Sequence, residues 1–432
     1  MPLQVTMNGD GNFRWPEPAA RRMADSVHKE VRDMVAHSRL TRKTEGIALV
    51  RRSQLDVGVL LGRGAFSEVH EVRLVNDPER RKYAMKHLKF KLMSQPENFR
   101  LAAAELAVEA HMLASFDHPN ILKIRGWAAN GVASFAEGGH DSFFLILDAL
   151  QETLDQRICR WETQEEVFKQ NHAAMHCSMG FLDVWKRLSQ PHETVRTFMH
   201  EPAYQQLFLE KLGVCAEIAC ALNYLHERGV IFRDLKPNNI GFLNGRVQLF
   251  DFGLSRELPG CDLVQPFAMS GKVETLRYMA VEVATQQAYN VSADVFSWAM
   301  VSYEVLTLCK PFAGWTRDMH HNMVCVQGVR PDTTMLPSNV RHMLEACWSQ
   351  RPSLRPPMCS VVHQVRMLEE QQLLVCVEQQ AAQNVRVELP DDFMVRKVPS
   401  RMHSETVATS ATMLSGESML SAESAIPSDY MI

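Results

Sequence analysis

The chain has 432 residues, of which 46% are apolar and 22% are charged, a balance typical of a globular protein with a sizeable core. Its net charge of −4 gives no general attraction to nucleic acid or to an acidic membrane, so neither is an expected partner. Apolar runs such as Phe143 to Leu147 are far too short for membrane insertion, and the N-terminus lacks the apolar core of a signal peptide.

The ten cysteines show no CxxC spacing, which in a chain of this length favours reduced thiols over a disulfide framework. A cytoplasmic location, or a nuclear one, is therefore expected. The sequence leaves the oligomeric state open.

The first 52 residues form an N-terminal extension with a predicted helix near Ala20–His37. Met23, Val27, Val31 and Val35 recur every four residues and predict an apolar face. That face either packs on the body of the protein or binds a partner.

After Leu55 the pattern changes from helical to alternating, which indicates short strands. The elements expected in chain order are strands at Val57–Leu61, Val69–Val75 and Lys82–Leu88, a helix at Asn98–Ser115, and strands at Ile121–Trp127 and Phe143–Leu147. Helical patterns dominate after Leu150. The expected fold class is α+β, with a small β-rich lobe, a larger helical lobe and a cleft between them.

Three later segments leave alternatives open. Residues 160–205 are a solvated or packing segment, unless His172 and His176 share a helical face that binds zinc. The run Leu368–Val377 predicts a last helix, whose Gln-rich continuation packs on the body or mediates oligomers. From about residue 385 the chain is rich in Ser and Thr and poor in large apolar side chains, which predicts disorder.

A glycine-containing turn joins the first two predicted strands. Gly62 and Gly64, in the sequence from Leu61 to Val69, let a hairpin backbone approach phosphates without a Cβ clash. Alone, the pattern also fits an ordinary tight hairpin. A dinucleotide-binding turn is excluded because a strand follows instead of a helix, and a P-loop is excluded because no Gly-Lys-Ser/Thr follows.

Acidic and amide groups gather in the stretch from Ile231 to Asn239 and in Asp251-Phe252-Gly253, which begins twelve residues after Asn239. Phosphoryl transfer needs a carboxylate that receives a hydroxyl, and a carboxylate and an amide oxygen that bind hard metal ions. Polar turn residues without a function are the alternative. The paired spacing resembles the catalytic loop and the metal-binding loop of eukaryotic protein kinases.

Further motifs extend this resemblance over roughly residues 55–370. Lys236 resembles the lysine of serine/threonine kinases, and the motifs Asp294-Val295-Phe296-Ser297-Trp298 and Cys347-Trp348 look most like the tyrosine-kinase-like group. The resemblance implies a bilobal kinase domain at residues 53–370, with segment 160–205 as an insert, and a C-terminal extension at 371–432. It also implies ATP and Mg²⁺ as cofactors and a protein as substrate.

The resemblance assigns the nucleotide-binding side of the cleft. Lys86 contacts the α- and β-phosphates, and Glu109 on the following helix is its partner, with Glu105 as the fallback. Leu147 is the gatekeeper and Asp148 begins the hinge. The ATP-binding residues so assigned are Leu61, Gly62, Gly64, Val69, Ala84, Lys86, Glu109, Leu147 and Asp148.

On the catalytic side, the resemblance makes Asp234 the base or the residue that orients the hydroxyl. Lys236 stabilises charge on the transferred phosphoryl group, and Asn239 and Asp251 bind Mg²⁺.

The resemblance also implies regulation by an upstream kinase. Arg233 is expected to pair with a phosphorylated residue of the activation segment. Ser270 is the leading acceptor, with Ser255 behind it, and Thr275 is expected to contact the catalytic aspartate. In the same way, Arg355 is expected to pair with Glu282.

Several positions depart from the family pattern. They are Ser67 for a third glycine, Phe232 for the usual histidine, Gly241 for a bulkier residue beneath adenine, Glu274 for a glycine and Val281 for a proline. Ser67 is expected to alter the flexibility of the turn without preventing phosphate binding, whereas the other four changes favour a pseudokinase that acts as a nucleotide-binding scaffold. A dual-specificity kinase and a small-molecule phosphotransferase are further alternatives. The joint presence of Lys86, Glu109, Asp234, Asn239 and Asp251 favours an active serine/threonine kinase, because each handles a separate charge.

Overall fold

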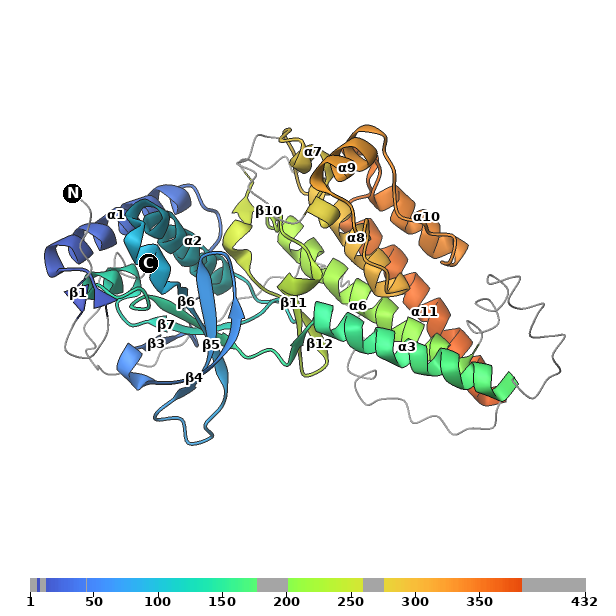
Figure 1. Ribbon diagram of the computed structural model, residues 1–432, viewed down its shortest axis with the longest axis horizontal. Helices are drawn as coiled ribbons and strands as arrows, with labels where there is room; N and C mark the ends of the chain where they lie inside the picture. Colours follow the sequence, from blue (N-terminus) through green and yellow to red (C-terminus); the bar gives the residue numbers. More distant parts are fainter. Residues whose placement is uncertain (1–5, 8–12, 44, 177–200, 259–275, 383–432) are drawn as a thin grey trace, which may run out of the picture.

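The computed structural model describes residues 6–7, 13–43, 45–176, 201–258 and 276–382. They form two lobes along the long axis of the molecule: strands with α1 and α2 at one end, and long helices at the other (Figure 1). The expected α+β class with a β-rich lobe and a helical lobe is confirmed.

The small lobe is built on a six-stranded sheet in the order β3-β7-β8-β6-β5-β4. Its strands are β3 (Ala48–Val50), β4 (Leu55–Arg63), β5 (Ser67–Leu74), β6 (Tyr83–Leu88), β7 (Ile124–Ala128) and β8 (Phe144–Asp148). Five of the six coincide with predicted strands. β3 was not predicted; it pairs in parallel with β7, so the end of the N-terminal extension joins this sheet.

Helices α1 (Glu17–Val35) and α2 (Pro96–Ser115) pack against each other on this lobe. Met23, Val27 and Val31 of α1 are buried, which confirms that the apolar face of the predicted helix packs on the body of the protein. Trp15, just before α1, meets Phe99 of α2 edge to face at 4.6 Å between ring centroids. The extension is thus tied to α2 through the core.

The large lobe is mainly helical. Its helices are α3 (Leu154–His176), α6 (Pro202–His226), α7 (Val281–Ala284), α8 (Ser292–Thr307), α9 (Arg317–His320), α10 (Ser338–Cys347) and α11 (Met358–Ala382). α6 packs against α3, α8 and α11. Buried Trp298 of α8 donates its Nε1–H to the carbonyl of Cys215 in α6 at 3.0 Å.

The described parts of segment 160–205 continue α3 and begin α6. His172 and His176 lie on α3, and residues 177–200 fall outside the described chain. Within the described residues, no group of three His, Cys, Asp or Glu side chains could hold a metal ion. The run Leu368–Val377 lies in α11, as predicted, and α11 packs along α6. The tail from residue 385 lies outside the described part.

Short strands line the junction between the lobes. They are β9 (Glu152–Thr153), β10 (Val230–Ile231), β11 (Ile240–Leu243), β12 (Arg246–Leu249) and β13 (Arg256–Glu257). A separate pair, β1 (Thr6–Met7) and β2 (Phe13–Arg14), lies near the N-terminus. β11 pairs with β12 and β9, and β10 pairs with β13. These pairs frame the loops that carry the predicted catalytic and metal-binding residues.

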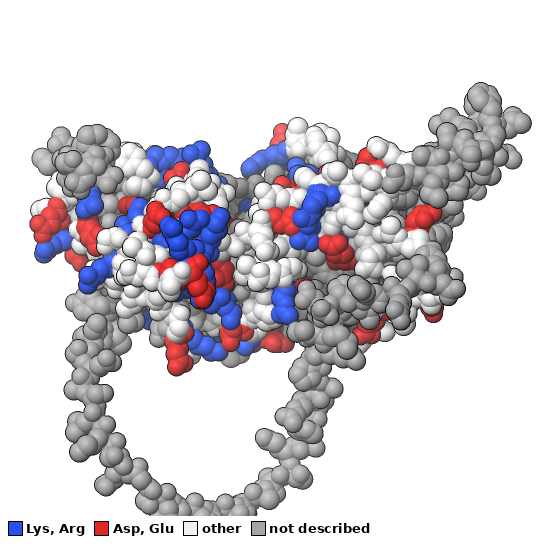
Figure 2. Space-filling view, turned by 90° about the horizontal axis from the view of Figure 1, so that it is seen from below, with Lys and Arg blue, Asp and Glu red and all other residues white. Residues whose placement is uncertain are grey.

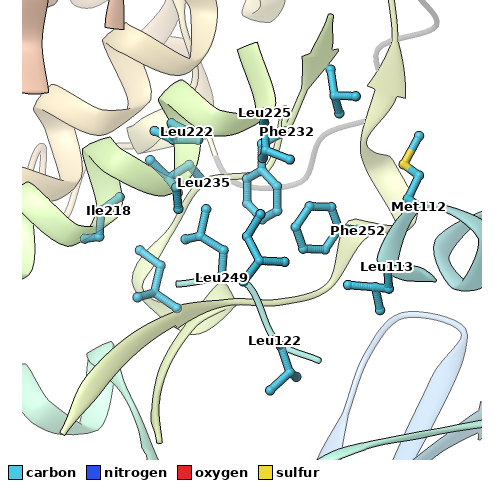
Figure 3. Packing of buried hydrophobic residues seen from close by; sticks show 14 of the residues in the cluster. Met112, Leu113, Leu122, Ile218, Leu222, Leu225, Phe232, Leu235, Leu249 and Phe252 are labelled. Atoms are coloured by element: carbon cyan, nitrogen blue, oxygen red, sulfur yellow. The ribbon is translucent and has the colours of Figure 1, made fainter. Parts of the chain in front are cut away.

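The buried core continues across the junction. Phe232 and Phe252 meet edge to face at 5.1 Å, with Leu113 of α2 near Phe252 (Figure 3). An aromatic ring in place of the usual histidine therefore fills an apolar position in the core.

The surface carries mixed charge. On the face shown in Figure 2, basic and acidic side chains are interspersed over the described residues. In the part of the chain that the structure covers, no helix is long and apolar enough to cross a membrane. The cysteines described there are all free thiols, as expected.

Candidate active site

Lys86 of β6 stands at the centre of the site. Its Nζ lies 2.8 and 2.6 Å from the two carboxylate oxygens of Glu109 on α2, and 2.7 Å from Oδ1 of Asp251. Lys86 and Glu109 are buried, with 8% and 2% of their surfaces exposed. One ammonium group thus joins α2 to the loop after β12.

The charges of this cluster stabilise one another. Burial alone would lower the pKa of Lys86, but the adjacent Asp251 and Glu109 carboxylates raise it above its ordinary value. Lys86 in turn lowers the pKa of Asp251. The lysine is therefore a fixed cation and Asp251 a fixed anion at neutral pH.

The structure separates the two glutamates that the sequence considered as partners of Lys86. Glu109 makes the ion pair. Burial raises the pKa of Glu105, one turn earlier on α2, and the positive charge of Arg256 is the strongest influence that lowers it. Glu105 therefore interacts chiefly with Arg256 and makes no ion pair with Lys86.

The catalytic loop follows β10 and ends in the short helix η4 (Pro237–Asn239). Nζ of Lys236 lies 2.7 Å from Oδ2 of Asp234, and Nδ2 of Asn239 donates to that same oxygen and to the Asp234 carbonyl, each at 2.9 Å. Burial raises the pKa of Asp234 despite the attraction of Lys236. The loop thus holds one carboxylate in a defined orientation.

Asp294, near the start of α8, supports the backbone of this loop. Its carboxylate accepts hydrogen bonds from the N–H groups of Phe232 at 2.8 Å and Arg233 at 2.9 Å, and it contacts His226 at 3.0 Å. Arg233 has a φ of 75°, in the left-handed region that a non-glycine residue rarely adopts. The buried carboxylate holds this strained turn in place.

Asn239 and Asp251 fit a Mg²⁺ site. Because the amide nitrogen of Asn239 donates to Asp234, its amide oxygen remains as the donor that a hard cation prefers. Asp251 supplies a carboxylate that is 43% exposed. Two protein oxygens suit Mg²⁺, which keeps water and phosphate oxygens as its other ligands.

The glycine-containing turn connects β4 with β5. The Gly64 N–H donates to the carbonyl of Ser67 at 2.9 Å, and a Cβ at Gly64 would lie 2.9 Å from the Ser67 hydroxyl oxygen. A Cβ at Gly62 would meet open space. Ser67 therefore closes a tight turn, and its hydroxyl would have to turn away before a side chain could be placed at Gly64.

Strand register brings the remaining nucleotide-side residues together. Val69 of β5 pairs with Lys86, and Ala84 of β6 pairs with Leu147 of β8. Asp148 follows Leu147, and its carboxylate accepts two hydrogen bonds from Arg125, each at 2.8 Å. Leu61, at the end of β4, is 49% exposed beside the turn.

Leu150 occupies the space beneath the hinge that a side chain at position 241 would need. A Cβ on buried Gly241 would lie 2.6 Å from Cδ1 of Leu150 and 3.2 Å from the carbonyl oxygen of Glu152. β9 and β11 hold these backbones next to each other through the Gly241–Thr153 pair. The missing side chain of Gly241 is thus offset by a residue that the sequence comparison did not consider.

The predicted regulatory residues are only partly described. Ser270 and Thr275, like Glu274, lie outside the described residues. The second phosphate acceptor considered, Ser255, is fully buried and donates its hydroxyl to the Phe232 carbonyl at 3.2 Å. Ser255 is therefore wrong as an accessible phosphorylation site, because its hydroxyl is already used inside the loop.

Arg233 shares its surroundings with a second arginine, Arg256. Burial lowers the pKa of Arg256, and the positive charge of Arg233 lowers it further. Arg233 also lies over the ring of Tyr289 at 5.8 Å. Arg256 was missed from the sequence. Its position three residues after Asp251-Phe252-Gly253 could have drawn attention to it.

A buried ion pair joins the end of the activation segment to the helical lobe. The guanidinium of Arg355 lies 2.6 and 2.8 Å from the carboxylate oxygens of Glu282, as the sequence predicted. Val281, at the start of α7, is buried beside it. The substitution of the usual proline by Val281 leaves this pair intact.

A comparison with known protein families matches the part of the chain that carries these residues. Residues 55–365 match the family described as protein tyrosine and serine/threonine kinase. The chain belongs to this family. The kinase fold expected from the motifs is confirmed by this match and by the two lobes.

Individual relatives are similar at moderate identity. The chain is 29% identical to human ribosomal protein S6 kinase alpha-6, over 71% of this chain and 34% of the relative. It is 32% identical to the serine/threonine/tyrosine-protein kinase HT1 of Arabidopsis thaliana, over 41% and 45%, and 27% identical to human serine/threonine-protein kinase Nek11, over 73% and 41%. The matches thus span a third to less than half of these relatives.

Proposed function

We propose that this chain is an ATP-dependent protein serine/threonine kinase that transfers the γ-phosphoryl group of ATP to a hydroxyl of a protein substrate. The observation that carries the proposal is a pair of polar clusters. Lys86 contacts both Glu109 and Asp251, and Asp234 is bound by Lys236 and Asn239. A scaffold that only binds a partner needs none of these charges together. The names of the similar kinases support the same activity.

The residues divide the work of the reaction. Lys86, kept in place by Glu109, offers a fixed positive charge to the α- and β-phosphates. Asp234 orients the incoming hydroxyl and receives its proton, and the ammonium of Lys236 lies where it stabilises negative charge on the transferred group. Asn239 and Asp251 would hold Mg²⁺, which neutralises phosphate charge when it is bound.

The adenine side is assigned to the strands and the hinge. In this proposal Leu61, Gly62, Gly64, Val69, Ala84, Leu147 and Asp148 surround the nucleotide. Leu150 would form the apolar floor in place of a side chain at Gly241.

Regulation by phosphorylation forms part of the proposal. At the start of the activation segment, the positive charge of Arg233 is close enough to lower the pKa of Arg256. A phosphate on that segment, with Ser270 as the leading acceptor, would pair with them and relieve their mutual repulsion. An upstream kinase is the corresponding partner, and the protein is assigned to the tyrosine-kinase-like group and to the cytoplasm or nucleus.

Transfer of labelled phosphate tests this function. With Mg²⁺, labelled ATP and a generic basic protein, the wild type should form phosphoserine or phosphothreonine. Asp234→Asn should lower the rate by about a hundredfold or more, because the hydroxyl loses its oriented carboxylate. Asp117→Asn, at an ion pair with Lys123 that is more than half exposed, is the matched control and should keep the wild-type rate.

The outcome separates the alternatives. Phosphotyrosine alongside phosphoserine would indicate a dual-specificity kinase. If the wild type transfers no phosphate, even after treatment with an activating kinase, the catalytic proposal fails and a nucleotide-binding scaffold replaces it.

A further inference from the structure

The segment that follows α1 contacts the residues just after the metal-binding loop. The Ser38 hydroxyl donates to one carboxylate oxygen of Glu257 at 2.7 Å, and the Arg39 N–H donates to the other at 2.7 Å. The Arg39 guanidinium also donates to the Leu258 carbonyl at 3.0 Å. Glu257, with a side chain only 14% exposed, thus has both oxygens engaged by the N-terminal extension.

The same segment also contacts α2. The Ser38 hydroxyl oxygen lies 3.2 Å from Nε2 of His111, and the Lys43 N–H donates to the Ala114 carbonyl at 2.8 Å. Because the Ser38 hydrogen points to Glu257, Nε2 of His111 must be the donor to Ser38. A single hydroxyl therefore bridges α2 and the beginning of the activation segment.

The two elements joined in this way carry the partners of Lys86. His111 lies two residues after Glu109 on α2, and Glu257 lies six residues after Asp251. Movement of α2 away from the sheet would separate Glu109 from Lys86, and it would also break the contacts of Ser38 with His111 or Glu257.

Polar contacts, more than tight packing, hold this junction. A small cavity lies here between α1, α2 and β13, and its apolar wall includes Val35, Leu40, Val108 and Met112. The side chains that line the cavity lack contacting atoms on one side, so they lose part of their dispersion attraction. The hydrogen bonds to Glu257, which involve a charged acceptor, are accordingly the stronger link.

We propose that Ser38, Arg39 and Glu257 are positioning residues for the kinase reaction. They hold α2 against the start of the activation segment, so that Glu109 and Asp251 meet on Lys86. This inference rests on the proposed function for its effect on rate, but the positioning of α2 can be measured separately. The N-terminal extension then supports the catalytic residues through this contact.

Point variants of the full-length chain test the inference. Glu257→Gln replaces one of two acceptor oxygens with an amide group, and Arg39→Gln removes the guanidinium at a position that is 45% exposed, where folding should be preserved. Arg21→Gln is the matched control, because it breaks an ion pair of the same extension that is exposed on both sides. Arg39→Lys keeps the charge and should remain close to the wild type.

Two quantities are measured well below the unfolding temperature: kcat, and hydrogen exchange of the α2 amides around Glu109. Glu257→Gln should lower kcat about tenfold, the equivalent of one charge-assisted hydrogen bond, and should accelerate exchange in α2. Arg39→Gln should act in the same direction. The double variant should be little worse than Glu257→Gln, because both changes break the ion pair between the Arg39 guanidinium and the Glu257 carboxylate, which are 3.3 Å apart.

Two results would overturn the inference. One is wild-type α2 exchange in both Glu257→Gln and Arg39→Gln; the other is effects of the two changes that simply multiply in the double variant. A lower melting temperature with unchanged kcat and unchanged α2 exchange would show a purely structural role. If the wild type transfers no phosphate, the proposed function fails, and α2 exchange alone still decides whether these residues position α2.

Discussion

At the scale of single residues, Gly241 and Leu150 share one volume beneath the hinge. A Cβ at position 241 would meet the end of a flexible side chain at 2.6 Å, so Leu150 would have to move before any larger residue could fit. The backbone carbonyl of Glu152, at 3.2 Å, limits the space on the other side. The glycine at position 241 therefore leaves room for the Leu150 side chain, which fills the space that a larger residue at 241 would occupy.

This exchange predicts a non-additive pair of substitutions. Gly241→Leu should displace Leu150 toward the adenine site and raise the KM for ATP about tenfold, since overpacking costs on the order of 1–3 kcal/mol. Leu150→Gly combined with Gly241→Leu should recover most of that loss. Steady-state kinetics over a range of ATP concentrations measures both, and an unchanged KM in Gly241→Leu would refute the shared volume.

Two buried histidines predict how stability depends on pH. Burial lowers the pKa of His87 and of His111 from 6.5 to about 4, so the folded protein binds fewer protons than the unfolded chain between these values. Their contribution to stability is fully present above pH 6.5 and is lost as the pH falls toward 4. Each histidine faces charges that modify this effect: His70, His140 and Asp141 around His87, and Arg42 and Glu257 around His111.

Denaturant unfolding at pH 7 and pH 5 checks this sign. The wild type should be less stable at pH 5, and His87→Gln should show a smaller difference between the two pH values. If His87→Gln lost as much stability between pH 7 and pH 5 as the wild type, His87 would not contribute to the pH dependence.

At the scale of elements, the Glu282–Arg355 pair links α7 to the segment before α11. The side chains of Arg355 and Glu282 are 0% and 4% exposed. Removal of one partner would leave a buried charge without its counterion, which typically costs about 3–5 kcal/mol. The pair therefore fixes the end of the activation segment against the helical lobe.

Glu282→Gln should accordingly destabilise folding by about 3–5 kcal/mol, read as a lower denaturant midpoint. Glu17→Gln, at an exposed pair with Arg21, should change stability by less than about 1 kcal/mol. Equal effects of the two substitutions would mean that burial does not strengthen the dependence on Glu282.

Sequence patterns predict elements best where the pattern is local. The alternation from Val57 to Leu88 and the spacing of Met23, Val27 and Val31 correspond to observed strands and to α1. β3 was missed because three residues, two of them exposed, carry too little periodicity to reveal a parallel pairing with β7. The extension of α3 to His176 and the start of α6 at Pro202, both within segment 160–205, were missed because helix–helix packing, not a motif, decides them.

At the scale of the whole molecule, the site depends on elements that are distant in the sequence. The resemblance of the motifs to those of protein kinases allowed the prediction of Lys86, Glu109, Asp234, Asn239 and Asp251. No spacing rule could reveal that Ser38 would reach Glu257, or that Leu150 would cover Gly241. Such contacts arise only when the extension, α2 and the hinge have packed together in the folded protein.

The rate of phosphoryl transfer in matched lysine variants tests the central claim most directly. Lys86→Met removes the buried ammonium that joins Glu109 and Asp251. Lys82→Met removes an ammonium just before the same strand, where Lys82 is 59% exposed and pairs with Glu71. We predict that Lys86→Met lowers the rate about a hundredfold or more, whereas Lys82→Met retains the wild-type rate. Equal rates in the wild type and in Lys86→Met would contradict the account.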